Sequence, residues 1–326
     1  MAFLKRNGDL ILNKEININF LKNNIKEFSY SLGFDKVGFA RFRFLSKEIE
    51  KYKNWLANGY QASMDYLEKN IDKRENIGLI LSDVKSLIVF AHSYFTNVNH
   101  SKSNFKISRY AWGDDYHDIL EKKIRKVANF ISEQVDTFKF KIYVDTGPIL
   151  EKIWAVEAGI GWQGKNSLVL SQELGSYFFI GIMLTNLDFL PDTTVVDRCG
   201  KCRKCIDACP TNAIVSPKVV DSRRCISFWT IEKKIHEEIP HQLDFKGWIF
   251  GCDICQEVCP WNNKAKITNE LAFYPRNGKT NLEEEDLMKL TIENFKEVFR
   301  KSPIKRAKFE GLMKNYLHLR GLNEFE

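Results

Sequence analysis

Residues 199–210 read CGKCRKCIDACP, and residues 252–260 read CDICQEVCP. These two runs hold seven of the eight cysteines, Cys225 is the eighth, and the 198 residues before them hold none. Closely spaced cysteines followed by one before proline bind the two [4Fe-4S] clusters of bacterial ferredoxins. Thiolates suit iron in a sulfide cluster, and eight of them supply two such clusters. The sequence therefore predicts a chain that handles electrons one at a time.

The spacing also predicts which thiolates share a cluster, because the cysteine before proline ligates the other cluster in the bacterial pattern. The first cluster is expected on Cys199, Cys202, Cys205 and Cys259. The second cluster is expected on Cys209, Cys225, Cys252 and Cys255. The second run departs from the plain pattern, because its first ligand position holds Ile249 and Cys225 must substitute. A loop, 226–251, is thus inserted between two ligands of the second cluster.

Two other uses of the cysteines fit the sequence less well. Zinc sites usually pair two separated C-x2-C hairpins. Disulfides need an oxidising compartment, but the first fifteen residues have only Leu10–Leu12 as an apolar core, too short for a signal peptide. The longest apolar stretch, near 178–184, is far below a membrane span. We expect a soluble, cytoplasmic protein with no membrane partner.

Length and composition predict two or more domains with a substantial core, since the chain has 326 residues and is 44% hydrophobic. The net charge of +7 permits a polyanionic partner without requiring one. We expect an α+β (mixed α/β) fold. Residues 1–190 would form the α/β domain, 191–265 the cluster domain behind a linker at 191–198, and 266–326 a helical basic tail.

Apolar periodicity gives the expected elements of the first domain. Runs rich in Val, Ile and Phe predict four strands, at Val37–Phe42, Leu87–Phe95, Phe140–Val144 and Tyr177–Leu184. The clearest helical pattern is 117–135, with apolar residues on one face and lysines elsewhere. A second helix is expected over 148–158, where Pro148 suits a first helical turn.

Three segments outside the cysteines are candidates for chemistry. Asp145 stands where a strand ends and a helix begins, so it is either a general acid or, as the residues alone favour, a helix N-cap. The run RYAWGDDYH (109–117) is either a capped helix start with core aromatics or part of a site. The run GIGWQG (159–164) matches G-x-G-x-x-G but follows a helix instead of a strand. It predicts a helix C-cap and tight turn, or a close approach to a flat ligand beside Lys165, Asn166 and Ser167.

Basic residues are frequent around the cluster domain and in the tail, for example Arg223, Arg224, Lys305 and Arg306. With Trp229, Trp248 and Trp261 nearby, they suit a folded RNA through phosphates and stacked bases. Solvated basic faces are common, so composition alone leaves this interpretation open.

Taken together, these motifs resemble the epoxyqueuosine reductase family, which catalyses the last step of queuosine synthesis on tRNA. The matching segments are 109–117, 144–152, 158–170, 175–181, 199–214, 252–262 and 303–315. They cover nearly the whole chain from about residue 15, and simple ferredoxins have none of the upstream elements.

The resemblance implies an oxidoreductase that binds cobalamin beside two [4Fe-4S] clusters. It implies a nitroreductase-like cobalamin-binding core, similar to that of reductive dehalogenases, followed by a ferredoxin-like domain. The substrate would be epoxyqueuosine in a tRNA anticodon stem-loop, reduced to queuosine with release of water. Electrons would come from a low-potential donor, and we expect a monomer.

By the same resemblance, Asp145 corresponds to the proton donor. Asp115, Tyr116 and His117 would line the substrate pocket near the cobalt. The expected cobalamin contacts are Arg74, Ser108, Arg109, Asp145, Lys165, Asn166, Ser167, Cys225 and Ser227.

One departure from the family and two rival functions remain. Some members extend into C-terminal HEAT-type repeats that help grip tRNA, whereas this sequence ends at Glu326. That leaves tRNA binding to the cluster domain and the tail. The rivals are a dehalogenase-like corrinoid reductase acting on a small molecule, and a non-enzymatic electron carrier without cobalamin.

Overall fold

The computed structural model describes residues 17–100 and 105–322. The first fifteen residues, from which the absence of a signal peptide was predicted, lie outside this range. At the centre is a four-stranded antiparallel sheet in the order β1-β2-β7-β4. Its strands are Lys36–Arg41 (β1), Ser86–Ser93 (β2), Phe178–Thr185 (β7) and Phe140–Tyr143 (β4). All four predicted strands are therefore present, each within about two residues of the expected bounds.

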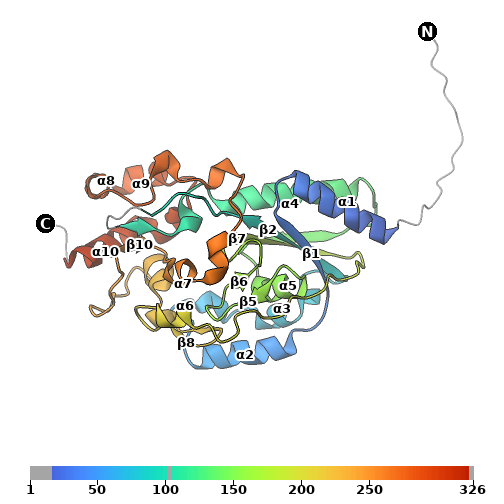
Figure 1. The fold of residues 1–326 in the computed structure, drawn as a ribbon, viewed down its shortest axis with the longest axis horizontal. Helices are drawn as coiled ribbons and strands as arrows, with labels where there is room; N and C mark the ends of the chain where they lie inside the picture. The colour runs from blue at the N-terminus through green and yellow to red at the C-terminus, as the bar shows by residue number, and fades with distance from the viewer. Residues whose placement is uncertain (1–16, 101–104, 323–326) are drawn as a thin grey trace, which may run out of the picture.

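Helices cover both faces of the sheet (Figure 1). On one face α1 (Ile18–Ser31) and α4 (Tyr116–Ser132) contribute Leu21, Ile25 and Leu120 to a core with sheet residues. On the other face, α5 (Glu151–Glu157) and α2 (Ser46–Ala57), with α3 (Ile71–Glu75) beside them, pack over a second core. The resulting three-layer α/β core agrees with the predicted mixed fold.

Two helix predictions need correction at their ends. The helix expected over 117–135 ends at Ser132, although Val135 stays buried against the same core. The helix expected over 148–158 begins only at Glu151, with Leu150 at the N-cap. Asp145 lies five residues before that N-cap and has a φ of 57°, a left-handed backbone conformation. The N-cap interpretation of Asp145 is therefore wrong.

The glycine run is a helix end followed by a hairpin. Gly159 follows the last helical residues with a φ of 71°, as a C-terminal glycine cap requires. The strands β5 (Trp162–Gln163) and β6 (Val169–Leu170) then pair, and a side chain on Gly161 would collide with the Leu170 carbonyl. The predicted C-cap and tight turn are confirmed.

The cysteine-bearing segment is a compact set of short elements to the left of the sheet and below it in Figure 1. It contains α6 (Lys204–Asp207), β8 (Ile214–Ser216), β9 (Val219–Val220), the π-helical turn η5 (Phe228–Glu232), β10 (Trp248–Phe250) and α7 (Ile254–Glu257). The expected linker is irregular, yet it is held to β1. The Asp192 carboxylate accepts from the Phe39 N–H and pairs with Lys22 and Lys26.

The tail folds back over the middle of the chain. It comprises α8 (Glu284–Met288), α9 (Ile292–Val298), the 3-10 turn η9 (Pro303–Ala307) and α10 (Lys308–Arg320). Its apolar side chains share one cluster with Phe105, Trp112 and Phe250. The β3 strand (Lys106–Ile107) pairs with β10, so three segments distant in sequence form one core.

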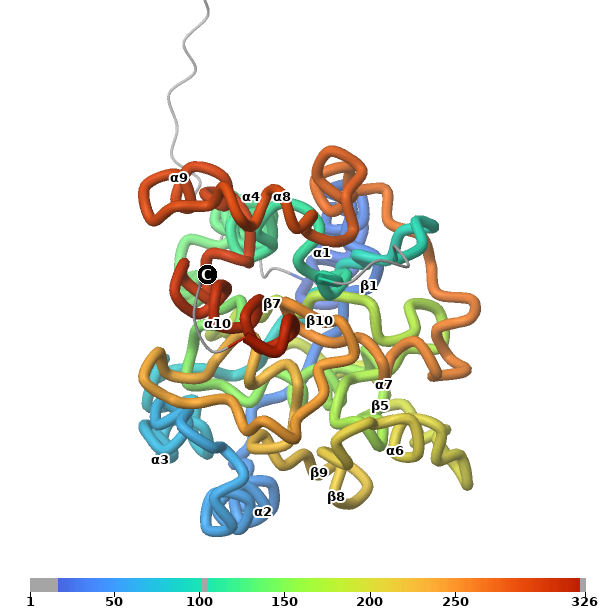
Figure 2. Tube along the Cα trace, turned by 90° about the vertical axis from the view of Figure 1, so that its left-hand side faces the viewer, coloured from blue at the N-terminus to red at the C-terminus, as the bar shows by residue number. Residues whose placement is uncertain are grey.

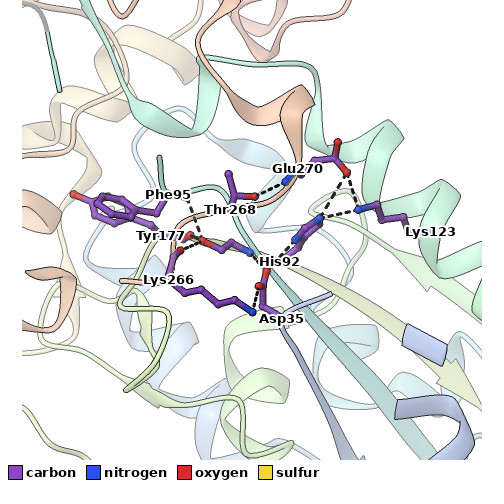
Figure 3. Close-up of polar contacts among 9 residues, drawn as sticks. Asp35, His92, Phe95, Lys123, Tyr177, Lys266, Thr268 and Glu270 are labelled. Atoms are coloured by element: carbon purple, nitrogen blue, oxygen red, sulfur yellow. Dashed lines mark hydrogen bonds and ion pairs between the residues drawn. The ribbon is translucent and has the colours of Figure 1, made fainter. Parts of the chain in front are cut away.

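A buried polar network fastens the chain just beyond the second cysteine run to the sheet (Figure 3). Asp35 contacts His92 Nδ1 at 3.0 Å and Lys266 at 2.9 Å, while Lys123 contacts both His92 and Glu270. Burial alone would raise the pKa of Asp35, but hydrogen bonds from His92 and Ser93 outweigh it and the pKa is lowered. This network fixes the segment that follows the second cysteine run against the sheet.

Candidate functional site

The eight thiols fall into two groups by their mutual electrostatic effects. The pKa of Cys205 is raised by burial and then by Cys259, Cys199 and Cys202. The pKa of Cys255 is raised by burial and then mainly by Cys225, Asp253 and Cys209. The largest thiol effects come from within each predicted ligand set, and the assignment of cysteines to the two clusters stays a prediction. All eight cysteines are free of disulfides. Among the described residues, no group of three or more His, Cys, Asp or Glu side chains is arranged to hold a single metal ion.

The second cysteine run is held from inside the protein. Asp253 lies between Cys252 and Cys255 and is fully buried. Its carboxylate accepts from the Ser108 hydroxyl at 2.5 Å and from the Arg109 N–H at 2.7 Å. Ser108 and Arg109, predicted to hold the corrin, thus hold the loop of the second cluster in this structure.

The first cysteine run is exposed to solvent. Cys202 is exposed, and Arg203 and Asp207 form a surface ion pair beside it. Lys165 donates to the carbonyls of Gly200 and Cys202 at 2.7 and 2.8 Å. Lys165 therefore clamps the loop of the first cluster, and its predicted role at the corrin stays a prediction.

Asp145 projects from the loop between β4 and α5. Its carboxylate accepts from the Tyr116 hydroxyl at 2.8 Å and lies 3.9 Å from His117 Nε2. Its side chain is 66% exposed, so a substrate can reach it. The structure thus brings Asp145 together with Tyr116 and His117, which were predicted for the same pocket.

Asp115 caps α4 and orients His117. Its carboxylate accepts from the His117 N–H and contacts His117 Nδ1 at 2.7 Å. Because a carboxylate only accepts, this contact assigns the hydrogen to Nδ1 and leaves Nε2 facing Asp145. Burial opposes ionisation of Asp115, but His117 and Lys305 outweigh it and hold its pKa well below the usual range. Both interpretations of this run therefore apply, because the helix cap is also the support of the site.

Glu151 was not singled out from the sequence. Its Oε1 accepts from the Asp145 N–H at 2.8 Å, which stabilises the left-handed backbone of Asp145. Burial, followed by repulsion from Asp145, raises the pKa of Glu151 to about 8. A carboxyl at the first position of a helix reads as an ordinary helix start, so only the folded loop reveals its contact with Asp145.

The charge of Asp145 also affects Tyr66, Tyr110, Lys152 and Arg306, from four separate segments. Tyr66 and Lys152 are exposed to solvent, yet surrounding protein desolvates them and raises the pKa of Tyr66 to about 12 while lowering that of Lys152. We call the surroundings of the Asp145 carboxylate, with Tyr66, Tyr116, Lys152 and Arg306, the Asp145 recess.

The segment that follows Cys225 reaches the Asp145 recess. Glu232 of η5 accepts from the Tyr66 hydroxyl at 3.4 Å and pairs with Arg306. The thiols of Cys255 and Cys225 also affect the pKa of Lys152.

The other predicted cobalamin contacts lie in several places. Asn166 and Ser167 form the turn of the β5–β6 hairpin, where Asn166 is buried with an unpartnered Nδ2. Arg74 is buried on α3 with its guanidinium over the Tyr52 ring. Ser227 helps to lower the pKa of Cys225 against the dominant effect of burial, so it lies beside the second cluster.

The prediction that Trp229, Trp248 and Trp261 stack on RNA bases needs correction. Trp248 is fully buried and Trp229 nearly so, because both pack with Ile226, Phe228 and Phe245 in a core inside the inserted loop. Trp261 is half-buried against Trp162. Trp229 and Trp248 are thus unavailable as stacking platforms.

Comparisons with known proteins agree with this geometry. A family model described as epoxyqueuosine reductase QueG, DUF1730 matches residues 74–146. A model described as a 4Fe-4S double cluster binding domain matches residues 198–262, which confirms the predicted two-cluster segment. No helix among the described residues is long and apolar enough to cross a membrane.

Similar proteins extend this agreement along the chain. The epoxyqueuosine reductase of Cellulophaga algicola is 41% identical over 293 residues, covering 89% of this chain and 95% of that protein. The epoxyqueuosine reductase of Atelocyanobacterium thalassa is 40% identical over 302 residues, covering 90% of this chain and 97% of that protein. A crystal structure of epoxyqueuosine reductase with an epoxyqueuosine-modified tRNA-Tyr stem loop is 30% identical, with a TM-score of 0.86 over 93% of this chain and 81% of that one. A structure of epoxyqueuosine reductase from Bacillus subtilis has its catalytic aspartate loop swung out of the active site. It is 29% identical, with a TM-score of 0.85 over 93% of this chain and 82% of that one.

Proposed function

The chain belongs to the epoxyqueuosine reductase family, since it is 40–41% identical to curated members over nearly their whole length, and we propose that its reaction takes place in the Asp145 recess. It is an oxidoreductase that converts epoxyqueuosine in tRNA to queuosine. The observation that carries the proposed site is the set of contacts that Asp145 makes with Tyr116, His117 and Glu151. A tRNA substrate implies a cytoplasmic reaction.

The reaction sets what the site must provide. An epoxide, two electrons and two protons give an alkene and water. Two clusters transfer single electrons, so the reduction proceeds in two one-electron deliveries. The recess therefore needs one neighbour that supplies electrons and at least one group that supplies protons.

The residues present fit a cobalamin in the Asp145 recess. The exposed ring of Tyr66 and the side chain of Lys152 suit a flat, amide-bearing corrin. Lys152 and Ser227 would hold it on the side of the second cluster. When bound, cobalamin supplies a strongly reducing cobalt that reacts with the epoxide carbon.

Asp145 donates the proton to the oxygen of the opening epoxide. Tyr116 fixes its carboxylate, and His117 Nε2 lies at 3.9 Å to return a proton from solvent. Glu151, which is protonated at neutral pH because its pKa is raised to about 8, stores the second proton beside Asp145. The related structure with a swung-out catalytic aspartate loop supports a loop that moves between turnovers.

The tRNA stem-loop approaches over the tail and the inserted loop. Lys305 and Arg306 lie on η9 at the edge of the recess, and Arg224 is exposed nearby in sequence to Cys225. Phosphate contacts release counterions, so affinity should fall steeply between about 50 and 200 mM salt. The tRNA-bound relative supports this partner.

The test is conversion by the full chain reconstituted anaerobically with iron, sulfide and cobalamin. Reduced methyl viologen supplies electrons, and an epoxyqueuosine-bearing stem-loop is the substrate. Nucleoside mass spectrometry should show queuosine only when cobalamin is present. A fully reconstituted chain that retains corrin absorbance and leaves epoxyqueuosine unchanged would overturn the proposal.

A further inference from the structure

The exposed first-cluster loop has a surface composition that the reaction in the Asp145 recess does not use. Residues 196–218 carry five basic and two acidic side chains. Asp207 pairs with Arg203 and Asp197 pairs with Lys218, both at the surface. Within the described part of the chain, Arg198, Lys201 and Lys204 are exposed and have no ion-pair partner.

Apolar side chains accompany this charge. Val196 is 72% exposed and Val215 is 39% exposed. They lie on two segments that the Asp197–Lys218 ion pair joins, and the Lys218 N–H donates to the Lys165 carbonyl. The first-cluster face, defined as Val196, Arg198, Lys201, Cys202, Lys204 and Val215, thus has apolar and positive groups around an exposed cluster ligand.

This face is also held in one shape. Lys165 clamps two carbonyls of the cysteine loop, and the Cys199 N–H donates to Asp197 at 2.8 Å. A prearranged surface loses little entropy on docking, so a small interface can still bind.

Electron flow gives this face a direction. The segment after Cys225 reaches the recess through the Glu232–Tyr66 contact, and the first cysteine run lies next to the second, because α6 packs against α7. The cysteines of the second group are half-buried, whereas Cys202 is exposed. An electron from outside therefore enters most directly at Cys202.

We propose that the first-cluster face is the docking site of an acidic, low-potential one-electron carrier protein. This inference rests on the proposed function, because it needs a recess that consumes electrons. Transient electron-transfer partners use small interfaces steered by opposite charge. The tRNA is the less fitting polyanion here, since Figure 2 shows α6, which carries Cys205, at the opposite side of the molecule from α3, which follows Tyr66 of the recess.

The test uses the reconstituted full chain and a plant-type [2Fe-2S] ferredoxin as the probe. The variant is Lys201→Glu/Lys204→Glu. The matched control is Lys289→Glu/Lys296→Glu, which makes the same charge change near α8 and α9, far above α6 in Figure 1. Surface plasmon resonance measures association, and anaerobic stopped flow measures cluster reduction.

We expect the Lys201→Glu/Lys204→Glu variant to lower the ferredoxin association rate about tenfold or more at low salt. The difference should shrink at about 1 M salt, where the Debye length falls to about 3 Å. The control should match the unsubstituted chain, and methyl viologen should reduce the clusters of all three chains equally. Val196→Asp, which alters no residue between ligands, should also slow association.

Several results would overturn the docking site. One is unchanged ferredoxin association in Lys201→Glu/Lys204→Glu and in Val196→Asp. Another is weaker stem-loop binding with ferredoxin association intact, which would assign the face to RNA. A third is loss of iron from the lysine variant with normal association in Val196→Asp, which would mean that the charges only balance the cluster. Failure of the proposed function would look different, because methyl viologen would then drive no queuosine formation in the unsubstituted chain.

Discussion

The two cysteine runs have the same C-x2-C-x3-C-P spacing but opposite surroundings. The position after Cys202 holds Arg203, which is 61% exposed and forms a surface ion pair. The matching position after Cys252 holds Asp253, which is fully buried and accepts two hydrogen bonds from the chain at 108–109. Equal ligand spacing thus serves two tasks. The loop of the first run is exposed to solvent at Arg203, and the loop of the second run is held inside the protein by Asp253.

The largest effect is expected when the inner cluster is removed. Cys225→Ala deletes a ligand that only the inserted loop supplies, so iron should fall from about eight to about four atoms per chain. Queuosine formation should drop to background with either methyl viologen or ferredoxin as donor. Iron analysis and nucleoside mass spectrometry measure both. Full activity at halved iron content would show that the first cluster feeds the recess directly.

The next effect concerns the proton donor in the recess. Asp145→Asn keeps the size of the side chain and removes its acid, so turnover should fall by about 10²–10⁴-fold. Stem-loop affinity and retained corrin absorbance should stay within twofold, since neither requires the proton. Turnover close to that of the unsubstituted chain would exclude Asp145 as the acid.

The matched positions in the two runs give a direct test of their surroundings. Asp253→Asn replaces a buried charged acceptor, which should cost about 1–3 kcal/mol of stability. Arg203→Ala removes an exposed ion pair and should cost less than about 0.5 kcal/mol. Thermal midpoints and the rates of iron loss from the holoproteins compare the two. Equal losses would mean that the buried contacts of the second run add nothing.

The smallest effect concerns pH. The folded-state pKa of Glu151 is about 8 against an ordinary 4.5, so the folded chain binds more protons than the unfolded chain in that window. Its contribution to stability therefore declines as pH rises from about 4.5 to 8. Turnover should likewise fall as pH passes about 8, because Glu151 then no longer carries the proton that it supplies to the site.

Glu151→Gln keeps an oxygen that accepts from the Asp145 N–H but cannot titrate. It should lower turnover several-fold at pH 7 and remove the alkaline fall. A steady-state pH profile measures this, and a merely structural role for Glu151 would leave the alkaline fall unchanged.

Much of the fold and the site was predictable. Runs rich in Val, Ile and Phe, such as Val37–Phe42, predicted the strands, and β1 and β2 are buried over most of their length. The family resemblance predicted Asp145 with Asp115 and His117, and the fold brings the three together. The enzymatic prediction is confirmed, and the electron-carrier rival is wrong.

Other parts could not be predicted because they depend on contacts between distant segments. Trp248 looks like an RNA-stacking residue in a basic loop, yet the loop folds around it as a core. Lys305 looks like part of a solvated tail, yet it pairs with Asp115 at 2.7 Å. Glu151 looks like a helix start, yet the turn of the chain at Asp145 gives it a partner.

The sequence by itself determined the chemistry, because thiolate number and spacing set which clusters can form and in which pairing. Only the tertiary structure decided direction, that is, which cysteine run is held inside the protein and which is exposed. Spacing is a local property of the backbone, whereas burial depends on what the rest of the chain packs against each loop. Two cysteine runs of equal spacing therefore differ in burial, because Cys202 is exposed and Asp253, next to Cys252, is fully buried.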